Sequence, residues 1–340
     1  MVRDSFECEV KMNRREFIKA SAGASLYPFL NSCEQQVRWE KAAFIKTKRS
    51  QVAILAAEQY GSSLRDTIRR GIEMFRLELN GRRVLLKPNL VEFDLKGAIN
   101  THPAVIEAAV DAFKTLGARE VIVAEGPGHR RDNEYLLTAS GLYDVFKEHR
   151  IRYVDLNTDD VRLSKLKSSF THFHQLYLPE TLYNADLLVS MPKLKTHHWA
   201  GVTLSLKNMF GVVPGSVYGW PKNALHWAGI VGSILDINSS LPLPRFAIVD
   251  GIVGMEGNGP LQGQEKKSGV LIFGNDLVAV DATAARLMKI EPRKVKYLDL
   301  AGEFLGNIGY EQIDQIGENL HPYQQDFRVI DNFAYLKKLV

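Results

Sequence analysis

The sequence has little cysteine, little net charge and no long hydrophobic run, and each shortage excludes a class of protein. Only Cys8 and Cys33 occur among its 340 residues, so the chain has no thiolate zinc site and no cysteine set for an iron–sulfur cluster. The net charge of +4 comes from interspersed charges of both signs, which does not indicate a nucleic-acid-binding protein. Hydrophobic residues make up 45% of the chain, enough to bury a large core.

The most apolar part of the N-terminal region, residues 20–30, is too short to cross a bilayer of roughly 30 Å as a helix. It follows Arg14-Arg15 in a segment that resembles a twin-arginine export signal, and Leu30-Asn31-Ser32-Cys33 resembles a bacterial lipobox. We therefore expect the twin-arginine machinery to export the chain to the periplasm or cell envelope. A lipid anchor at Cys33 would be its sole contact with the membrane. An ordinary amphipathic terminal helix is the alternative.

Strand and helix patterns alternate along residues 50–310. Candidate strands are 52–55, 83–86, 120–124, 152–156, 187–190, 246–249 and 270–273, and candidate helices are 64–79, 103–116, 133–149, 228–241, 277–288 and 292–305. This order predicts an α/β fold, a mostly parallel sheet with helices on both faces in a three-layer sandwich. We expect residues 1–49 to be signal and linker, 50–310 the domain, and 311–340 a C-terminal extension.

Residues 187–215 concentrate the signals of a functional site. The apolar strand ends at Pro192, which cannot donate to a strand ladder, so we expect the chain to leave the sheet there. The residues that follow include Lys193, Lys195, His197 and His198, and then Lys207-Asn208. Open α/β sheets bind ligands beyond the carboxyl ends of their strands. This density of basic groups favours an anion-binding or catalytic loop over a solvated helix face.

Polar residues also follow other predicted strands. Lys87-Pro88-Asn89, Glu125-Gly126 and Asp250-Gly251 each come at the carboxyl end of an apolar run, and His102 stands at a helix start, where it can face an anion or cap the helix. Carboxyl ends of parallel strands share one edge of a sheet. We therefore expect one cleft lined by Lys87, Asn89, His102, Lys193, Lys195, His197, Lys207 and Asp250. Residues 250–260 are too rich in glycine to be expected in regular structure.

Together these motifs resemble the domain-of-unknown-function family numbered 362, over about residues 50–310. The resemblance rests on Lys87-Pro88-Asn89, His102-Pro103, Met191-Pro192-Lys193-Leu194-Lys195-Thr196-His197, Leu206-Lys207-Asn208, Asp250-Gly251 and Asp281. Members often carry ferredoxin-like cysteine motifs, which this chain lacks, so the resemblance is compatible with a separate redox partner protein but implies no cluster within the chain. As an analogy only, the basic loop also resembles lactate-racemase-like proteins that use a nickel-pincer nucleotide.

The leading hypothesis is an exported enzyme that binds an anionic small molecule or cofactor. In it His197, Lys195 and Lys207 are catalytic, with His197 as general acid or base. The residues expected to bind the ligand or cofactor are Lys87, Asn89, His102, Lys193, Asn208 and Asp250, and no metal ligand is predicted. The alternative is a non-catalytic solute- or cofactor-binding protein or a subunit of an envelope redox complex. Nickel-cofactor chemistry of the lactate-racemase kind is a more remote one.

Overall fold

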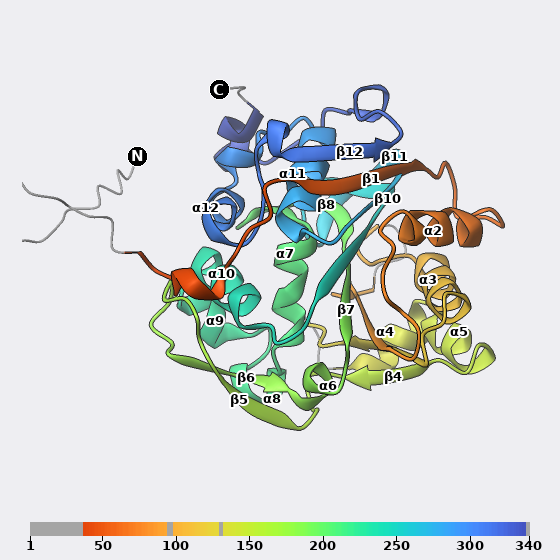
Figure 1. Cartoon of the computed structure of the whole chain (residues 1–340), viewed down its shortest axis with the longest axis horizontal. Helices are drawn as coiled ribbons and strands as arrows, with labels where there is room; N and C mark the ends of the chain where they lie inside the picture. Colours follow the sequence, from red (N-terminus) through yellow and green to blue (C-terminus); the bar gives the residue numbers. More distant parts are fainter. Residues whose placement is uncertain (1–36, 94–97, 129–131, 338–340) are drawn as a thin grey trace, which may run out of the picture. The chain divides into compact units, whose positions relative to one another are not determined.

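A computed structural model of the chain describes residues 37–93, 98–128 and 132–337. Within them, most strands join one mixed sheet (Figure 1). The strands are β1 (Ser50–Ala56), β2 (Arg83–Pro88), β3 (Glu120–Glu125), β4 (Arg152–Asp155), β5 (Val161–Lys165), β6 (Gln175–Pro179), β7 (Leu187–Met191), β8 (Lys193–His197), β9 (Gly201–Thr203), β10 (Arg245–Asn258), β11 (Gln262–Gly274) and β12 (Ile313–Gly317). The order is β12-β1-β11-β10-β7-β2-β3-β4, with β8 beside β10 and β9 beside β8, while β5 and β6 form a separate pair.

Most neighbours in the sheet are parallel. β12 and β1 run parallel, as do β10, β7, β2, β3 and β4 in succession. The exceptions among the described strands are β11, which pairs antiparallel with both β1 and β10, and β9, which pairs antiparallel with β8. The predicted α/β class with a mostly parallel sheet is therefore confirmed.

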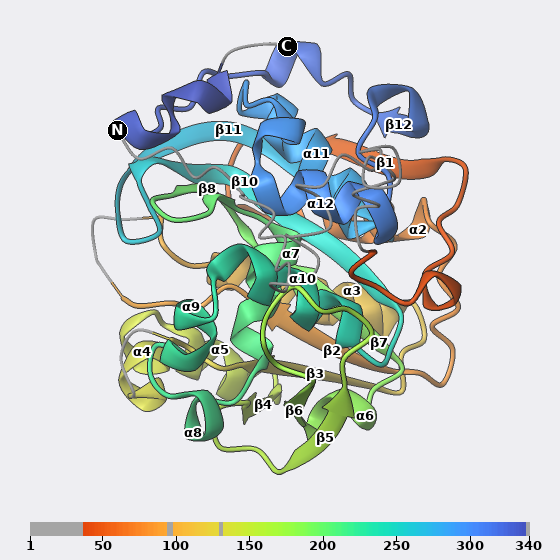
Figure 2. The same cartoon turned by 90° about the vertical axis from the view of Figure 1, so that its left-hand side faces the viewer.

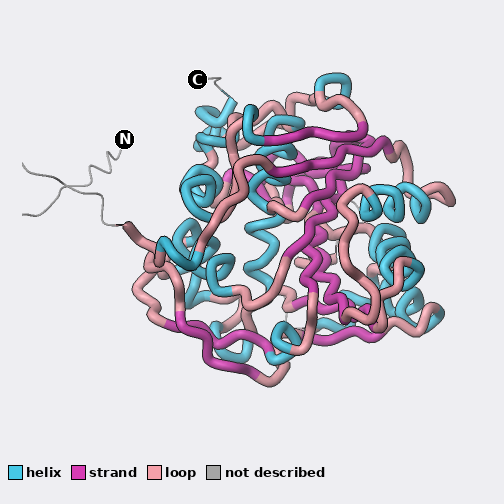
Figure 3. Tube along the Cα trace, viewed as in Figure 1, coloured by secondary structure: helices cyan, strands magenta, loops and turns pink. Residues whose placement is uncertain are grey.

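Helices cover both faces of the sheet, which lies between them in Figure 3. One face carries α2 (Leu64–Glu73), α3 (Pro103–Thr115), α4 (Asn133–Ala139) and α5 (Leu142–Glu148). The other carries α7 (Ser205–Asn208), α9 (Asn223–Trp227), α10 (Ile230–Ser240), α11 (Leu277–Leu287) and α12 (Lys296–Phe304), and Figure 2 looks onto this side. Shorter segments are α6 (Glu180–Tyr183), α8 (Gly215–Tyr218) and the 3₁₀ turns η1 (Lys41–Ala43), η2 (Met209–Val212), η3 (Pro292–Lys294), η4 (Tyr310–Gln312), η5 (His321–Tyr323) and η6 (Asp331–Lys337). No helix in the described ranges has the length and apolar character needed to cross a membrane.

The two cores follow from the two-residue repeat of a strand. In β1, Val52 and Ile54 pack into the core under α10–α12, whereas Ala53 and Leu55 pack into the core under α2 and α3. Strands buried on both faces read as continuous apolar runs, which is why the sequence shows runs here and not alternation.

Two helix predictions were too long. The helix predicted over 133–149 is divided into α4 and α5, because Gly141 between them adopts a left-handed φ of 74° that ends one helix and starts the next. The helix predicted to run to residue 79 ends at Glu73, followed by a turn in which Arg76 has a φ of 46°.

The expectation that the chain leaves the sheet at Pro192 was wrong. Residues 193–197 form β8, which is buried along its whole length and pairs with β10 and β9. Pro192 removes one donor from the ladder, but its carbonyl still accepts a hydrogen bond of 2.9 Å from the backbone N–H of Asp250. Pairing therefore resumes one residue later, and the lysines predicted in a loop lie on a strand.

The glycine-rich residues 250–258 were also wrongly expected to be irregular. They form the second half of β10, paired with β11 as far as Asn258 opposite Gln262. The glycines serve close packing, since a Cβ atom on Gly254 would lie 2.5 Å from the carbonyl oxygen of Leu194 in β8. Bare backbone in β10 thus lets β8 lie against it.

Neither predicted domain boundary is a structural one. Beyond residue 310, β12 pairs with β1, and Phe327 and Leu336 are fully buried, so the expected C-terminal extension is part of the domain. Before residue 50, Trp39 stacks on Phe304 of α12 with ring centroids 4.7 Å apart. The export motifs lie outside the described residues.

Candidate functional site

A cavity of about 270 Å³ opens where β2 and β3 end, between β8 and the segments that carry α7 and α9. The site residues predicted from the sequence that line it are Lys87, Asn89, Lys195, His197, Lys207 and Asn208. Leu90, Val91, Phe210 and Leu261 add apolar walls. A cavity of this kind, mostly apolar with a few convergent polar groups, is the usual form of a small-molecule site.

Lys87 and Glu125 form a buried ion pair in the cavity wall. The Lys87 ammonium lies 2.6 Å from both carboxylate oxygens of Glu125, and each side chain is 1% exposed. The backbone N–H groups of Leu90 and Gly126 also donate to this carboxylate. Asn208 is held against the pair, accepting from the Lys87 ammonium at 3.1 Å and donating to the Lys87 carbonyl. Both carboxylate oxygens of Glu125 therefore already accept hydrogen bonds from neighbouring groups.

Three further lysines line the cavity without a carboxylate. Among the described residues, neither Lys195, Lys207 nor Lys222 forms an ion pair, and Glu125 is the one acidic residue of the lining. Lys195 donates to the carbonyl of Ile99 at 2.8 Å, and Lys222 donates to the side-chain oxygen of Asn157. The Lys207 ammonium lies 4.6 Å from the ring centroid of Phe210. The cavity is thus lined by cations that no carboxylate of the described residues neutralises.

Burial makes these lysines unusually weak bases. It lowers the pKa of Lys207 to about 8, aided by the charge of Lys87, and it lowers the pKa of Lys222 to about 8. The pKa of Lys195 falls well below its ordinary value, through burial first and the charge of Lys207 second. An anion that binds beside buried ammonium groups without a counter-charge stabilises them.

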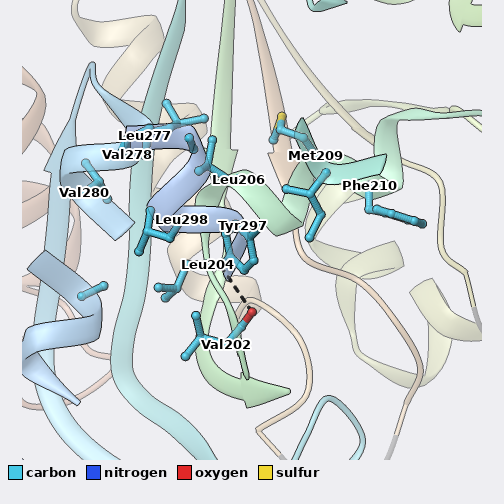
Figure 4. Packing of buried hydrophobic residues seen from close by; sticks show 14 of the residues in the cluster. Val202, Leu204, Leu206, Met209, Phe210, Leu277, Val278, Val280, Tyr297 and Leu298 are labelled. Atoms are coloured by element: carbon cyan, nitrogen blue, oxygen red, sulfur yellow. Dashed lines mark hydrogen bonds between the residues drawn. The ribbon is translucent and has the colours of Figure 1, made fainter. Parts of the chain in front are cut away.

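Lys207 and Asn208 are positioned by α7, whose start is fixed from α11. The buried carboxylate of Asp281 accepts hydrogen bonds from the backbone N–H groups of Ser205 and Leu206 at 2.7 and 2.9 Å. Leu204 and Leu206 on this segment share a buried cluster with Leu277 and Val278 of α11 and Leu298 of α12, and the Tyr297 hydroxyl donates to the carbonyl of Val202 (Figure 4). Asp281, the unexpected charge in an alanine-rich helix, therefore supports the site from behind and does not line it.

His197 is held as a neutral ring. Its Nδ1 accepts hydrogen bonds from the backbone N–H groups of Trp199 and Ala200 at 3.0 and 3.2 Å, so its proton is on Nε2. Burial, followed by the charge of Lys207, lowers its pKa well below the ordinary value. This geometry does not fit the predicted general base, because the ring nitrogen with a lone pair is occupied. It suits a hydrogen-bond donor through Nε2.

Three predicted site residues lie outside the cavity lining, in a neighbouring cluster. The Lys193 ammonium lies 2.7 Å from Asp250 and 2.9 Å from the Tyr60 hydroxyl, which itself donates to Asp250. The His102 backbone N–H donates to the same carboxylate, its ring stacks on Tyr60 at 3.7 Å, and its Nδ1 caps α3. These groups satisfy one another, so the single cleft expected from the sequence becomes a cavity and an adjacent structural cluster.

Some lining residues were missed. Glu125 was recognised at a strand end but was not assigned to the site, although a carboxylate at the end of an apolar run was a usable signal. Lys222 and His226 come from α9 and the turn before it, and no local pattern marks them. Among the described residues, no group of three or more histidine, cysteine, aspartate or glutamate side chains is placed to hold a metal ion.

The comparisons with known proteins agree with the motifs. A relative in Synechocystis sp. (strain ATCC 27184 / PCC 6803 / Kazusa), the "Thylakoid-associated protein sll1697", is 28% identical over 223 residues, covering 63% of this chain and 65% of that protein. The chain therefore spans less than two thirds of that relative's length.

Two solved structures show weaker likeness. The lactate racemase apoprotein from Thermoanaerobacterium thermosaccharolyticum has a TM-score of 0.43 at 12% identity, covering 72% of this chain and 58% of that one. A protein from Thermotoga maritima has a TM-score of 0.35 at 12% identity, covering 71% and 59%. Neither likeness is strong enough to bear on function. The family model "Domain of unknown function (DUF362)" matches residues 84–286, which include every predicted site residue, and the chain belongs to this family.

Proposed function

We propose that the chain binds an anionic organic molecule in the cavity and acts on it as an enzyme. The observation that carries the proposal is the set of three cavity lysines, Lys195, Lys207 and Lys222, without a carboxylate partner in the described residues. Burying cations without counter-charge costs several kcal/mol per ion, which an anionic ligand offsets. The apolar walls indicate an organic body attached to the anionic group.

The polar residues of the cavity have different roles in the proposed reaction. Lys195 and Lys222 hold the anionic group, and His197 donates from Nε2 to a ligand oxygen. Lys207, whose pKa is about 8, can give or take a proton near neutral pH, which is the requirement for a general acid or base. The catalytic proton transfer proposed for His197 is therefore reassigned to Lys207.

Anion affinity is expected to fall as the pH rises through about 8, because Lys207 and Lys222 lose their protons there. Below that pH both ammonium groups are charged and binding is strongest. Above it, affinity drops by up to about tenfold per pH unit for each coupled proton. Calorimetric titration of the full chain with phosphate and with small carboxylates, between about pH 6.5 and about pH 9.5, measures this.

The same titration decides the proposal. In two buffers of different ionisation enthalpy, the observed heats should differ, because binding recharges lysines and takes up protons. The proposal that the cavity binds an anion would be contradicted if no phosphate or carboxylate tested binds. It would also be contradicted by an affinity that increases above pH 8.

We further propose that the twin-arginine pair directs export. Replacing Arg14 and Arg15 by lysine is expected to keep the protein in the cytoplasm, because the receptor recognises the guanidinium pair and not charge alone. Cell fractionation and immunoblotting measure the distribution, with Lys19→Arg as a control that should be exported normally. Release of the Cys33→Ser protein from the membrane fraction would identify the lipid anchor, whereas export of the arginine double variant would contradict the signal.

A further inference from the structure

Lys207 has the surroundings of a nucleophilic amine. It is partly exposed in the cavity, and among the described residues its Nζ atom has neither a carboxylate nor a hydrogen-bond acceptor, only the ring of Phe210. The short helix beneath it is fixed at two backbone N–H groups by Asp281. The amine therefore enters the cavity from a fixed backbone, and no described residue holds it by a hydrogen bond or an ion pair.

The neighbours of Lys207 are predominantly basic side chains. Its charge is one of the causes that depress the pKa of Lys195, His197 and His226, and Lys87 acts on Lys207 in the same direction. Glu125 opposes this but is occupied by Lys87 and two backbone N–H groups. Burial first, and the charge of Lys87 second, favour the neutral amine of Lys207, which is the form that attacks a carbonyl group.

The other cavity lysines are less suited to this reaction. Lys87 is paired with Glu125, and Lys222 is hydrogen-bonded to Asn157. Lys195 is fully buried and tied to the carbonyl of Ile99. These three lysines are suited to positioning the ligand and to supplying positive charge. Lys207 remains as the amine that a ligand can reach.

We propose that Lys207 forms an imine with a ligand that carries both a carbonyl group and an anionic group, such as a carbonyl-bearing carboxylate or phosphate ester. The inference rests on the anion site proposed above. The neutral Nζ atom attacks the carbonyl carbon, forming a C–N bond and breaking the C–O π bond, and one of its two protons passes to the carbonyl oxygen to give a carbinolamine. The C–O bond then breaks, and the hydroxyl takes the second nitrogen proton and leaves as water, so amine and carbonyl become imine and water without an oxidant or reductant.

Other cavity groups can form hydrogen bonds with the carbonyl oxygen of the ligand as it is protonated and released as water. Nε2 of His197 supplies a hydrogen-bond donor for the carbonyl oxygen. Asn89 Oδ1 and Thr203 Oγ1 are buried polar atoms that line the same cavity and have no partner within the described residues. A carbinolamine hydroxyl and the departing water would provide the hydrogen bonds that these atoms lack.

The test uses aldehydes that carry an anionic group. The full chain is incubated with pyridoxal 5′-phosphate or with glyoxylate, reduced with borohydride, and mapped by peptide mass spectrometry. Reduction fixes an imine as a secondary amine of defined mass. The expected result is preferential labelling of Lys207 by at least one probe, at concentrations that leave the exposed Lys165 unlabelled, with labelling suppressed by excess inorganic phosphate.

Two variants serve as controls. Lys207→Arg should lose the adduct and Lys165→Arg should keep it, with thermal unfolding used to show that both variants are folded. Labelling at Lys195, at Lys222 or only at exposed lysines, or no reduced adduct with either probe, would overturn the assignment to Lys207.

The two proposals fail differently. Phosphate-induced stabilisation of the wild-type chain without any imine would leave the anion site intact and exclude the imine. If phosphate and small carboxylates neither bind nor stabilise the wild-type chain and no adduct forms, the anion site itself is excluded, and the imine with it.

Discussion

Glu125→Leu is expected to lower the free energy of unfolding by about 3–5 kcal/mol, the effect of removing one partner from a buried ion pair. The substitution leaves the Lys87 ammonium, 1% exposed, without its counter-charge. It also removes the acceptor used by the backbone N–H groups of Leu90 and Gly126. Urea denaturation at neutral pH, monitored by circular dichroism, measures the loss.

The same strand offers a matched control. Glu120 begins β3 as Glu125 ends it, but its ion pair with Arg83 is about one third exposed on both sides. Glu120→Leu should therefore change stability by no more than about 1 kcal/mol. The double variant Lys87→Met with Glu125→Leu should recover part of the loss, since no charge is left buried. Equal effects of Glu120→Leu and Glu125→Leu would contradict the energetic role given to the pair.

Replacing Lys195 and Lys207 together by methionine is expected to abolish ligand-induced stabilisation and at the same time to stabilise the ligand-free protein. The second effect follows mainly from Lys195, a fully buried cation without a carboxylate partner among the described residues, because an apolar side chain of similar size replaces it, a gain of about 1–4 kcal/mol by comparison with other buried charges. Thermal unfolding with and without the bound anion measures both quantities. A function that opposes stability is typical of a binding site.

Lys193→Met is a control that should change the stability of the ligand-free protein in the opposite direction. Lys193 lies one strand repeat from Lys195, yet its ammonium is paired with Asp250, which is fully buried. Its removal leaves an unpaired carboxylate, so the ligand-free protein should lose stability while the anion-induced shift remains. Destabilisation by the Lys195 and Lys207 substitutions, or an anion-induced shift that persists in their absence, would show that these lysines are ordinary structural residues.

The sequence predicted the sheet, and the edge at which the cavity opens, because apolar runs and proline breaks are local signals. Lys87 and Asn89 follow β2, and parallel strands bring such residues to one edge wherever they occur in the chain. The same reasoning found Lys195, His197 and Lys207. What it could not show was the division between the cavity and the Lys193–Asp250 cluster, since partner choice depends on distances across the fold.

The errors at β8 and β10 have one cause. Proline and glycine predict breaks in a strand, but in this fold Pro192 only lacks one hydrogen-bond donor, and Gly254 provides space for the backbone of β8. The low strand propensity of these residues does not prevent strand formation where packing against a neighbouring strand favours it. His197 illustrates a further limit, because its tautomer is set by backbone N–H groups two and three residues away.

The order of strands in the sheet also constrains how the chain can fold during synthesis. β1 is made early, but both of its neighbours, β11 and β12, lie more than 200 residues further along the chain. Until β11 and β12 have left the ribosome, β1 therefore has two open edges, the state in which strands pair with other chains. The sheet is thus completed only after β12 has been synthesised, through contacts of long sequence separation that form slowly.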